Sequence, residues 1–327
     1  MAFPRTEARN LSGWPAIDEP ELLERLALDD GKFRELVLAL AAKFPPRAYE
    51  VVSFERALGY PWARPPGSYR LASAGVELLA DMGAEERERA LAQFTSDGEG
   101  RSPVLAIGSN AAPETLAAKF AHFPAEEDRA VLALTGRLHD FDIGAAAQPA
   151  AYGSMPATLF PSPGTAVRAT VLWVTPTQFV QLAWSEFSYH LGRLRTRFEI
   201  DEINEHFDEV LVFVSRFGTF CVDERPVALA AIEAEGRTAE SLTQEQLLDA
   251  AATLALGPEA KGETLVRAIF EDMGAITPKF ATTVNQASLP FASDRWTPFG
   301  SGPSGERLAS NSQAAGLIES SGNTTRS

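Results

Sequence analysis

The turn Gly108-Ser109-Asn110 carries residue types that can bind an anion or a developing negative charge. Glycine lets backbone N–H groups approach a bound group without a Cβ in the way, while serine and asparagine add a hydroxyl and an amide. The apolar run 104–107 precedes the turn, and Pro113, which suits the first position of a helix, follows it. We therefore expect a strand, a turn and a helix start that can hold a carboxylate, although the same residues also form ordinary connectors.

The turn lacks the marks of better-known motifs. No Gly-Lys-Ser/Thr follows it, as in a Walker loop, and no further glycines follow at the spacing of a dinucleotide fingerprint. Ser109 also lacks the Gly-x-Ser-x-Gly setting of a hydrolase nucleophile. An unrelated hydrolase is therefore the least favoured interpretation.

Glu186 differs from most acidic residues of the chain because its neighbours are apolar or aromatic, among them Trp184, Phe187 and Tyr189. A glutamate in such a setting is either a surface residue on the wet side of a helix or a partly desolvated carboxylate suited to proton transfer near neutral pH. The sequence leaves both interpretations open.

Strand and helix patterns between residues 101 and 225 must position these candidates. Thr175 is a predicted N-cap, and Gln178 can complete a capping box for a helix that runs to about Leu191, where Gly192 ends it. Strands are predicted at residues 130–138, 157–160, 167–174, 210–214 and 219–222, with a turn at 161–164 and the last two strands forming a hairpin. This pattern predicts an α+β fold: a small mixed β-sheet or barrel with flanking helices.

The remaining chain divides into segments of different composition. Residues 1–100 are predicted to form a mainly helical N-terminal region, bounded by a polar linker at residues 96–100. Residues 101–225 form the predicted core, followed by a helical C-terminal region at 226–298. Residues 299–327 are rich in Gly, Ser and Asn and are expected to be a disordered tail.

Two parts of the N-terminal region have local patterns of their own. Residues 76–79 are predicted to be helical. Residues 60–69 combine aromatic residues with prolines, which excludes a regular helix. We interpret this stretch as a stiff, packed loop, with a lid over a pocket as the alternative.

Composition narrows the classes of partner. A net charge of −15 argues against nucleic acid or an anionic membrane surface as the main partner. Cys221 is the only cysteine, so no intrachain disulfide can form, which fits a cytoplasmic protein. Neither a signal peptide nor a membrane-spanning run is expected, and the four histidines show no metal-site spacing.

Three segments, taken in order, resemble the γ-glutamylcyclotransferase-like family. Residues 107–110 (Ile-Gly-Ser-Asn) resemble its Tyr-Gly-Ser-Asn motif, and Gly153 followed by residues 157–161 and Gly164 resembles its Gly-x-Ala-Thr-Ile-x-Pro-x-x-Gly segment. Residues 182–186 resemble its Leu-Asp-x-x-Glu segment, whose glutamate is the catalytic acid/base. Order and approximate spacing agree across roughly residues 103–222.

The resemblance implies a fold and a reaction. The fold is the α+β barrel of that family, and the reaction releases 5-oxoproline from a γ-glutamyl amine or amino acid by intramolecular aminolysis, without metal or cofactor. Glu186 would be the acid/base, and the expected substrate-binding residues are Ile107, Gly108, Ser109, Asn110, Gly153 and Tyr189. Ile107 replaces the motif's Tyr, Ala183 its Asp and Phe187 a Gly, which keeps a non-catalytic binding module on the same fold as the alternative.

Overall fold

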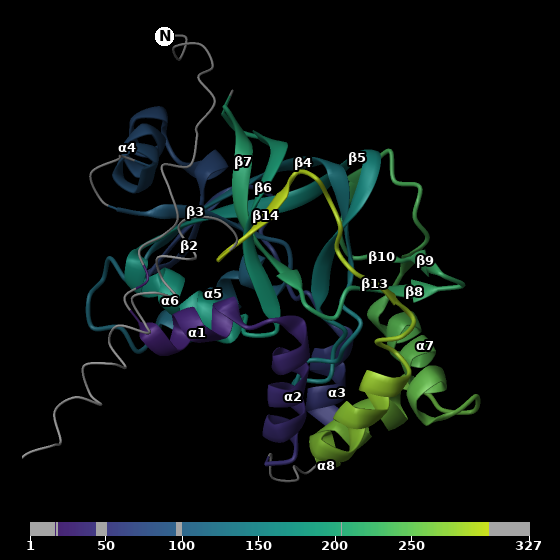
Figure 1. Cartoon of the computed structure of the whole chain (residues 1–327). Helices are drawn as coiled ribbons and strands as arrows, with labels where there is room; N and C mark the ends of the chain where they lie inside the picture. The colour runs from purple at the N-terminus through teal and green to yellow at the C-terminus, as the bar shows by residue number, and fades with distance from the viewer. Residues whose placement is uncertain (1–16, 18, 44–50, 96–99, 204, 301–327) are drawn as a thin grey trace, which may run out of the picture.

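A closed β-barrel lies at the centre of the computed structural model, which describes residues 17, 19–43, 51–95, 100–203 and 205–300 (Figure 1). Its strands are β3 (Ser102–Ala106), β4 (Val131–Ala145), β5 (Ala157–Val174), β6 (Tyr189–Ile200) and β7 (His206–Ser215). They pair in the order β4-β5-β3-β7-β6 and return to β4, and only β3 and β7 are parallel. The predicted α+β class, a mixed barrel with flanking helices, is confirmed.

The side chains of β3 alternate between two hydrophobic cores. Leu105 and Ile107 join the cluster inside the barrel, whereas Val104 and Ala106 join a second cluster outside it. Successive side chains of a strand point to opposite faces, so an uninterrupted apolar run fits a strand buried on both sides. Helices α1 (Pro20–Ala27), α5 (Pro113–Phe120) and α6 (Pro176–Ser185) cover the outer cluster.

Helix α6 begins where the sequence predicts but ends six residues earlier. The Thr175 and Gln178 capping box is present, and the helix stops at Ser185 with Glu186 as its C-cap. The predicted continuation to Leu191 is wrong because β6 begins at Tyr189 and pairs with β7. Gly192 therefore lies inside a strand, where a Cβ would collide with the ring of Trp296.

The predicted hairpin of residues 210–214 and 219–222 is also wrong. Strand β7 is paired with β6 on one edge and with β3 on the other, so no edge remains for the following strand. Strand β8 (Thr219–Val222) instead pairs with β9 (Arg225–Pro226) and β13 (Ser288–Leu289).

Two other local predictions change in the structure. Strand β5 continues through the predicted turn, although Pro161 and Ala166 both face Phe141, so the intervening residues form a bulge in the ladder. Residues 76–78 are not helical, because they belong to β2 (Gly75–Leu78), which pairs with β1 (Tyr69–Ala72), and Leu79 begins a short 3₁₀ helix η1 (Leu79–Asp81). Long-range pairing of β1 with β4 fixes this arrangement.

Helices from both ends of the chain gather at one end of the barrel (Figure 1). They are α2 (Asp30–Ala41), α3 (Val51–Leu58), α7 (Gln244–Leu256) and α8 (Gly262–Thr282), while α4 (Ala84–Thr95) lies apart from them. Helix α8 is interrupted at Asp272, whose Oδ1 accepts a hydrogen bond from the backbone N–H of Ala275 at 3.0 Å. The non-helical backbone at Asp272 therefore divides α8 into two segments.

Short strands connect the flanking regions to the barrel. Strands β10 (Ala228–Leu229), β11 (Ala234–Glu235), β12 (Ser241–Leu242) and β14 (Trp296–Pro298) belong to the same sheet as β1 and the barrel strands. Phe299, where the predicted tail begins, still donates its N–H to the carbonyl of Leu191 at 2.8 Å. Residues 301–327 of that tail, and 96–99 of the predicted linker, lie outside the described residues.

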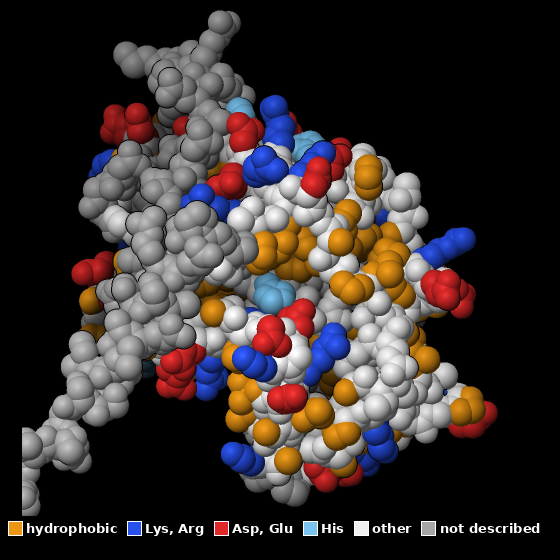
Figure 2. All heavy atoms as spheres, viewed as in Figure 1, with side chains coloured by type: hydrophobic (Ala, Val, Ile, Leu, Met, Phe, Trp, Pro, Cys, Tyr) orange, Lys and Arg blue, Asp and Glu red, His pale blue; other side chains and the backbone are white. Residues whose placement is uncertain are grey.

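The surface mixes charges of both signs. On the face shown in Figure 2, Asp and Glu side chains are interspersed with Lys and Arg side chains and with hydrophobic patches. The net charge of −15 is therefore not collected into one acidic patch on this face. Of the helices in the described ranges, none has the length and apolar character needed to cross a membrane.

Candidate active site

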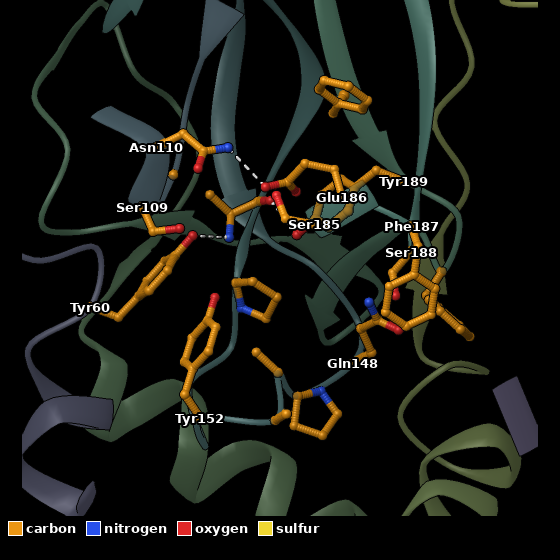
Figure 3. Close-up of a pocket in the computed structure, with 18 of the residues that line it drawn as sticks. Tyr60, Ser109, Asn110, Gln148, Tyr152, Ser185, Glu186, Phe187, Ser188 and Tyr189 are labelled. Carbon is orange, nitrogen blue, oxygen red and sulfur yellow. Dashed lines mark hydrogen bonds between the residues drawn. The ribbon is translucent and has the colours of Figure 1, made fainter. Parts of the chain in front are cut away.

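A cavity of about 620 Å³ lies beside the turn that follows β3. Its volume is within the range of small-molecule sites. Six of the seven residues predicted from the sequence line it, namely Ile107, Gly108, Ser109, Asn110, Glu186 and Tyr189. In Figure 3 Glu186 points toward Asn110, and the hydroxyls of Tyr60 and Tyr152 point toward the same space.

Glu186 and Asn110 are in direct contact. The Asn110 side-chain Nδ2 donates a hydrogen bond to Glu186 Oε1 at 2.8 Å, and the Glu186 side chain is only 17% exposed. Glu186 therefore lies one hydrogen bond away from the turn. Glu186 is therefore a mostly buried residue of the cavity and not a surface residue on the wet side of a helix.

Lys119 is a member of this cluster that sequence reasoning missed. Its Nζ donates to Asn110 Oδ1 at 2.6 Å and to Ser185 Oγ at 2.7 Å, and lies 3.6 Å from Glu186 Oε1. Burial lowers the pKa of the Lys119 ammonium, and the charge and hydrogen bonding of Glu186 oppose that shift. Because Lys119 uses Asn110 Oδ1, the amide of Asn110 presents its NH₂ to Glu186.

Tyr60 is a second missed residue, and it comes from the aromatic and proline-rich segment. Its hydroxyl accepts a hydrogen bond from the Ala157 N–H at 2.8 Å and lies against Gly108, where a Cβ would collide with it. Burial raises the pKa of Tyr60 to about 12, so the hydroxyl keeps its proton near neutral pH. Since the oxygen accepts from Ala157, its own O–H can point into the cavity as a donor.

Arg64, four residues after Tyr60, supports the turn from behind. Its guanidinium nitrogen Nη2 donates to the carbonyl oxygens of Ile107 at 3.0 Å and Gly108 at 2.9 Å. In a trans peptide the N–H points away from the C=O, so these bonds direct the N–H groups of Gly108 and Ser109 to the opposite side. Segment 60–69 is thus a packed loop, as interpreted, and Tyr60 and Trp62 also line the cavity.

Tyr189 and Tyr152 complete the aromatic wall. Tyr189 donates its hydroxyl to the Ala157 carbonyl at 2.9 Å, and the Tyr152 ring stacks on Tyr60 with centroids 6.1 Å apart. Burial raises the pKa of both hydroxyls well above the ordinary value. Ala157 is therefore held by two tyrosines, through its N–H by Tyr60 and through its carbonyl by Tyr189.

Gly153 is the one predicted site residue that the structure does not bring to the cavity. Its φ is +88°, and a Cβ there would lie 3.0 Å from Val266 and 3.4 Å from Ala57. It therefore occupies a tight turn packed between α3 and α8. Its neighbour Tyr152 lines the cavity in its place.

A barrel with a carboxylate-bearing cavity at one end is thus the class of protein that the fold and site define. No family model and no curated protein matches this chain. Among solved structures, it is similar to one described as a gamma-glutamyl cyclotransferase, with 17% identity, 35% of this chain and 66% of that chain covered, and a TM-score of 0.28. It is also similar to YkqA from Bacillus subtilis, with 12% identity, 70% and 73% of the chains covered, and a TM-score of 0.27. The match to the first of these spans just under two thirds of its length.

Proposed function

We propose that this protein is a γ-glutamylcyclotransferase-like enzyme that releases 5-oxoproline from a γ-glutamyl amine or amino acid. The observation that carries the proposal is the Glu186 carboxylate, which lies in the cavity beside the turn and accepts from Asn110 at 2.8 Å. The partner is accordingly a small γ-glutamyl-type molecule. The proposed chemistry uses side chains of this chain and needs no cofactor.

The reaction forms one carbon–nitrogen bond and breaks another. The substrate's α-amine attacks its own γ-carbonyl carbon and closes a five-membered lactam, and the bond from that carbon to the leaving nitrogen breaks. Two protons leave the α-ammonium and two reach the leaving nitrogen, which departs as an ammonium. Holding the amine against the carbonyl supplies a large entropic advantage.

Glu186 is suited to carry these protons because its two oxygens are used differently. Oε1 accepts from Asn110, whereas Oε2 has no hydrogen-bond or ion-pair partner among the residues that the structure describes. Oε2 is thus the oxygen that takes a proton from the α-ammonium and returns it to the leaving nitrogen. A positioned acid/base of this kind accelerates a reaction by about 10²- to 10⁴-fold.

The turn and Tyr60 supply donors for the negative charge that develops on the carbonyl oxygen. The N–H groups of Gly108 and Ser109 point away from the carbonyls that Arg64 binds, and that of Ser109 faces the Tyr60 oxygen, which leaves the Gly108 N–H as the backbone donor. The Tyr60 hydroxyl, protonated near neutral pH, lies against Gly108. Donors fixed before the reaction stabilise such an oxyanion without having to reorganise.

A non-catalytic binding module on the same fold is the second candidate. It is favoured by Ile107 and Ala183, which stand where the resembled motifs have Tyr and Asp, and both side chains are buried in apolar clusters. Incubation with γ-glutamyl amines and γ-glutamyl amino acids, followed by detection of 5-oxoproline, separates the candidates. Release of 5-oxoproline supports the enzyme, and binding without release supports the module.

A further inference from the structure

The cavity extends well beyond the groups that the proposed reaction requires. From Glu186 it continues to helix α2 and to the part of α8 after the kink at Asp272. Side chains that line this extension include Val37 and Leu38 of α2, and Met273, Thr277 and Phe280 of α8. We call this part the α2–α8 compartment.

The kink in α8 aims one helix face into the compartment. Met273, Thr277 and Phe280 are spaced four and three residues apart, so they share a face of the segment after Asp272. On α2, Arg34, Val37 and Leu38 share a face in the same way. Two helices from opposite ends of the chain thus form one wall.

The compartment is lined mainly by apolar side chains, although the amide of Gln148 lies next to Phe187 (Figure 3) and the Thr277 hydroxyl, which donates to the Met273 carbonyl, also lines it. Phe187, next to Glu186, and Phe217 add aromatic rings to its lining. The polar Asn285 donates its side-chain amide to the Ala147 carbonyl and is occupied by the protein itself. Among the described lining residues, the carboxylates are Glu114 and Glu186, which belong to α5 and the end of α6.

The charges around the cavity are also concentrated away from the compartment. Arg56 pairs with Glu114 at 3.2 Å, and Lys119 lies 3.6 Å from Glu186. Of the described lining residues on α2 and α8, Arg34 alone is charged, and it is exposed. A charged group packed against the α8 side chains of this compartment would lose its water without gaining an oppositely charged partner on that helix.

We propose that the compartment receives the leaving amine, and that this amine carries a large apolar substituent, aromatic or long-chain aliphatic. This inference rests on the proposed cyclotransferase function. The γ-glutamyl part needs the polar groups around Glu186 and the turn, so the rest of the 620 Å³ is available to the leaving group. Moving an apolar substituent from water into this lining favours binding, whereas an amine whose substituent is small or charged gains nothing there.

A series of γ-glutamyl amides of increasing apolar size tests the proposal. The methylamide, butylamide and 2-phenylethylamide are compared by kcat/KM for 5-oxoproline release with the wild-type protein, and by dissociation constant with Glu186→Gln. We expect both quantities to improve along the series, by roughly tenfold or more from the first amide to the last. A flat series, or a preference for the methylamide, overturns the proposal.

The failure of the inference and that of the proposed function give different results. Release of 5-oxoproline at the same rate from all three amides leaves the function standing and refutes the apolar compartment. If no amide yields 5-oxoproline, the proposed reaction fails, and the dissociation constants with Glu186→Gln still decide whether the compartment binds apolar groups. γ-Glutamylphenylalanine adds a carboxylate to the substituent of the leaving amine, and a marked preference for it over the 2-phenylethylamide would overturn the proposal that this substituent is uncharged.

A substitution in the α2–α8 compartment tests whether its lining causes the preference for apolar amines. Met273→Gln keeps nearly the same length but introduces an amide, and we expect the ratio of kcat/KM for the 2-phenylethylamide over the methylamide to fall roughly tenfold. Leu254→Gln makes the same kind of change on α7 at a side chain that is 42% exposed and does not line the cavity, so the ratio should stay unchanged. An unchanged ratio in Met273→Gln, with the dissociation constants equally unaffected, contradicts the assignment.

Discussion

Asn110 Nδ2 lies 2.8 Å from Glu186 Oε1, although the two residues are 76 positions apart in the chain. One follows the barrel strand β3 and the other caps the end of α6, so the contact joins two elements that the outer core packs together. Lys119 binds the other end of the Asn110 amide at 2.6 Å. This chain of contacts fixes Oε1, which is why the proposed mechanism assigns the proton transfer to Oε2.

Replacing Glu186 by Gln should preserve the fold and substrate binding but remove most turnover. Glutamine is nearly isosteric and can still accept from Asn110, yet it cannot carry a proton. We expect kcat for 5-oxoproline release to fall by about 10²- to 10⁴-fold, with little change in KM. The exposed glutamate of α8 provides the control: Glu263→Gln should leave kcat unchanged. Wild-type kcat in Glu186→Gln would refute its role.

Replacing Gly108 by Ala should damage both stability and activity. The added Cβ would collide with the Tyr60 hydroxyl and approach the Ala157 Cβ at 3.2 Å. We expect a loss of about 1–3 kcal/mol in the free energy of unfolding, measured by chemical denaturation.

A double-mutant cycle distinguishes this collision from a general effect of the methyl group. Tyr60→Phe removes the hydroxyl but leaves the Ala157 N–H without its acceptor, and therefore also destabilises the fold. The Gly108→Ala/Tyr60→Phe protein should lose less stability than the sum of the single changes. Strict additivity would show that the two groups do not meet.

Replacing Thr175 by Ala should cost roughly 1 kcal/mol of stability. The Thr175 hydroxyl accepts from the Gln178 N–H at 3.2 Å and donates to Asp128 Oδ1 at 2.6 Å, so the change removes both a helix cap and a link to the preceding loop. Thr175→Ser, which keeps the hydroxyl, should retain most of the stability. Equal losses for Ala and Ser, measured by urea denaturation, would place the stabilisation in the methyl group instead.

Acidification should weaken the fold through His190. Burial and the nearby Arg216 charge lower the pKa of His190 from 6.5, and Asp30, whose Oδ1 is 2.8 Å from His190 Nε2, opposes the shift. Because the folded pKa lies below the unfolded one, this contribution to stability is present above pH 6.5 and is lost as the pH falls through the folded value. Stability measured against pH should therefore decrease less below pH 6.5 in His190→Gln than in wild type. Parallel curves for the two proteins would contradict this origin.

Local signals were enough to predict the elements that carry the site. The apolar run before Gly108 and the capping box at Thr175 act within a few residues, and both appear where they were expected. The prediction that the helix reaches Leu191 was wrong because aromatic and apolar residues fit a helix or a strand. Pairing with β7 decides in favour of the strand. Long-range pairing is not visible in a single sequence.

The same reason explains which site residues were missed. Lys119 belongs to an amphipathic helix, and its contact with Glu186 depends on how α5 packs on α6. Tyr60 lies about fifty residues before the turn, and nothing in the local pattern indicates that its hydroxyl reaches Gly108. Gly153 was assigned by resemblance, but its backbone conformation and close packing explain the glycine without a ligand.

The α2–α8 wall has a consequence for how the protein responds to its ligand. The wall joins a helix from near the beginning of the chain to one from near its end, across the mouth of the barrel. A molecule bound there touches both helices, so its binding energy opposes the detachment of either. Saturating ligand should then slow proteolytic cleavage and amide hydrogen exchange in both helices together. A bound ligand would therefore couple the two helices, so that the amide hydrogens of both segments exchange together as one cooperative unit.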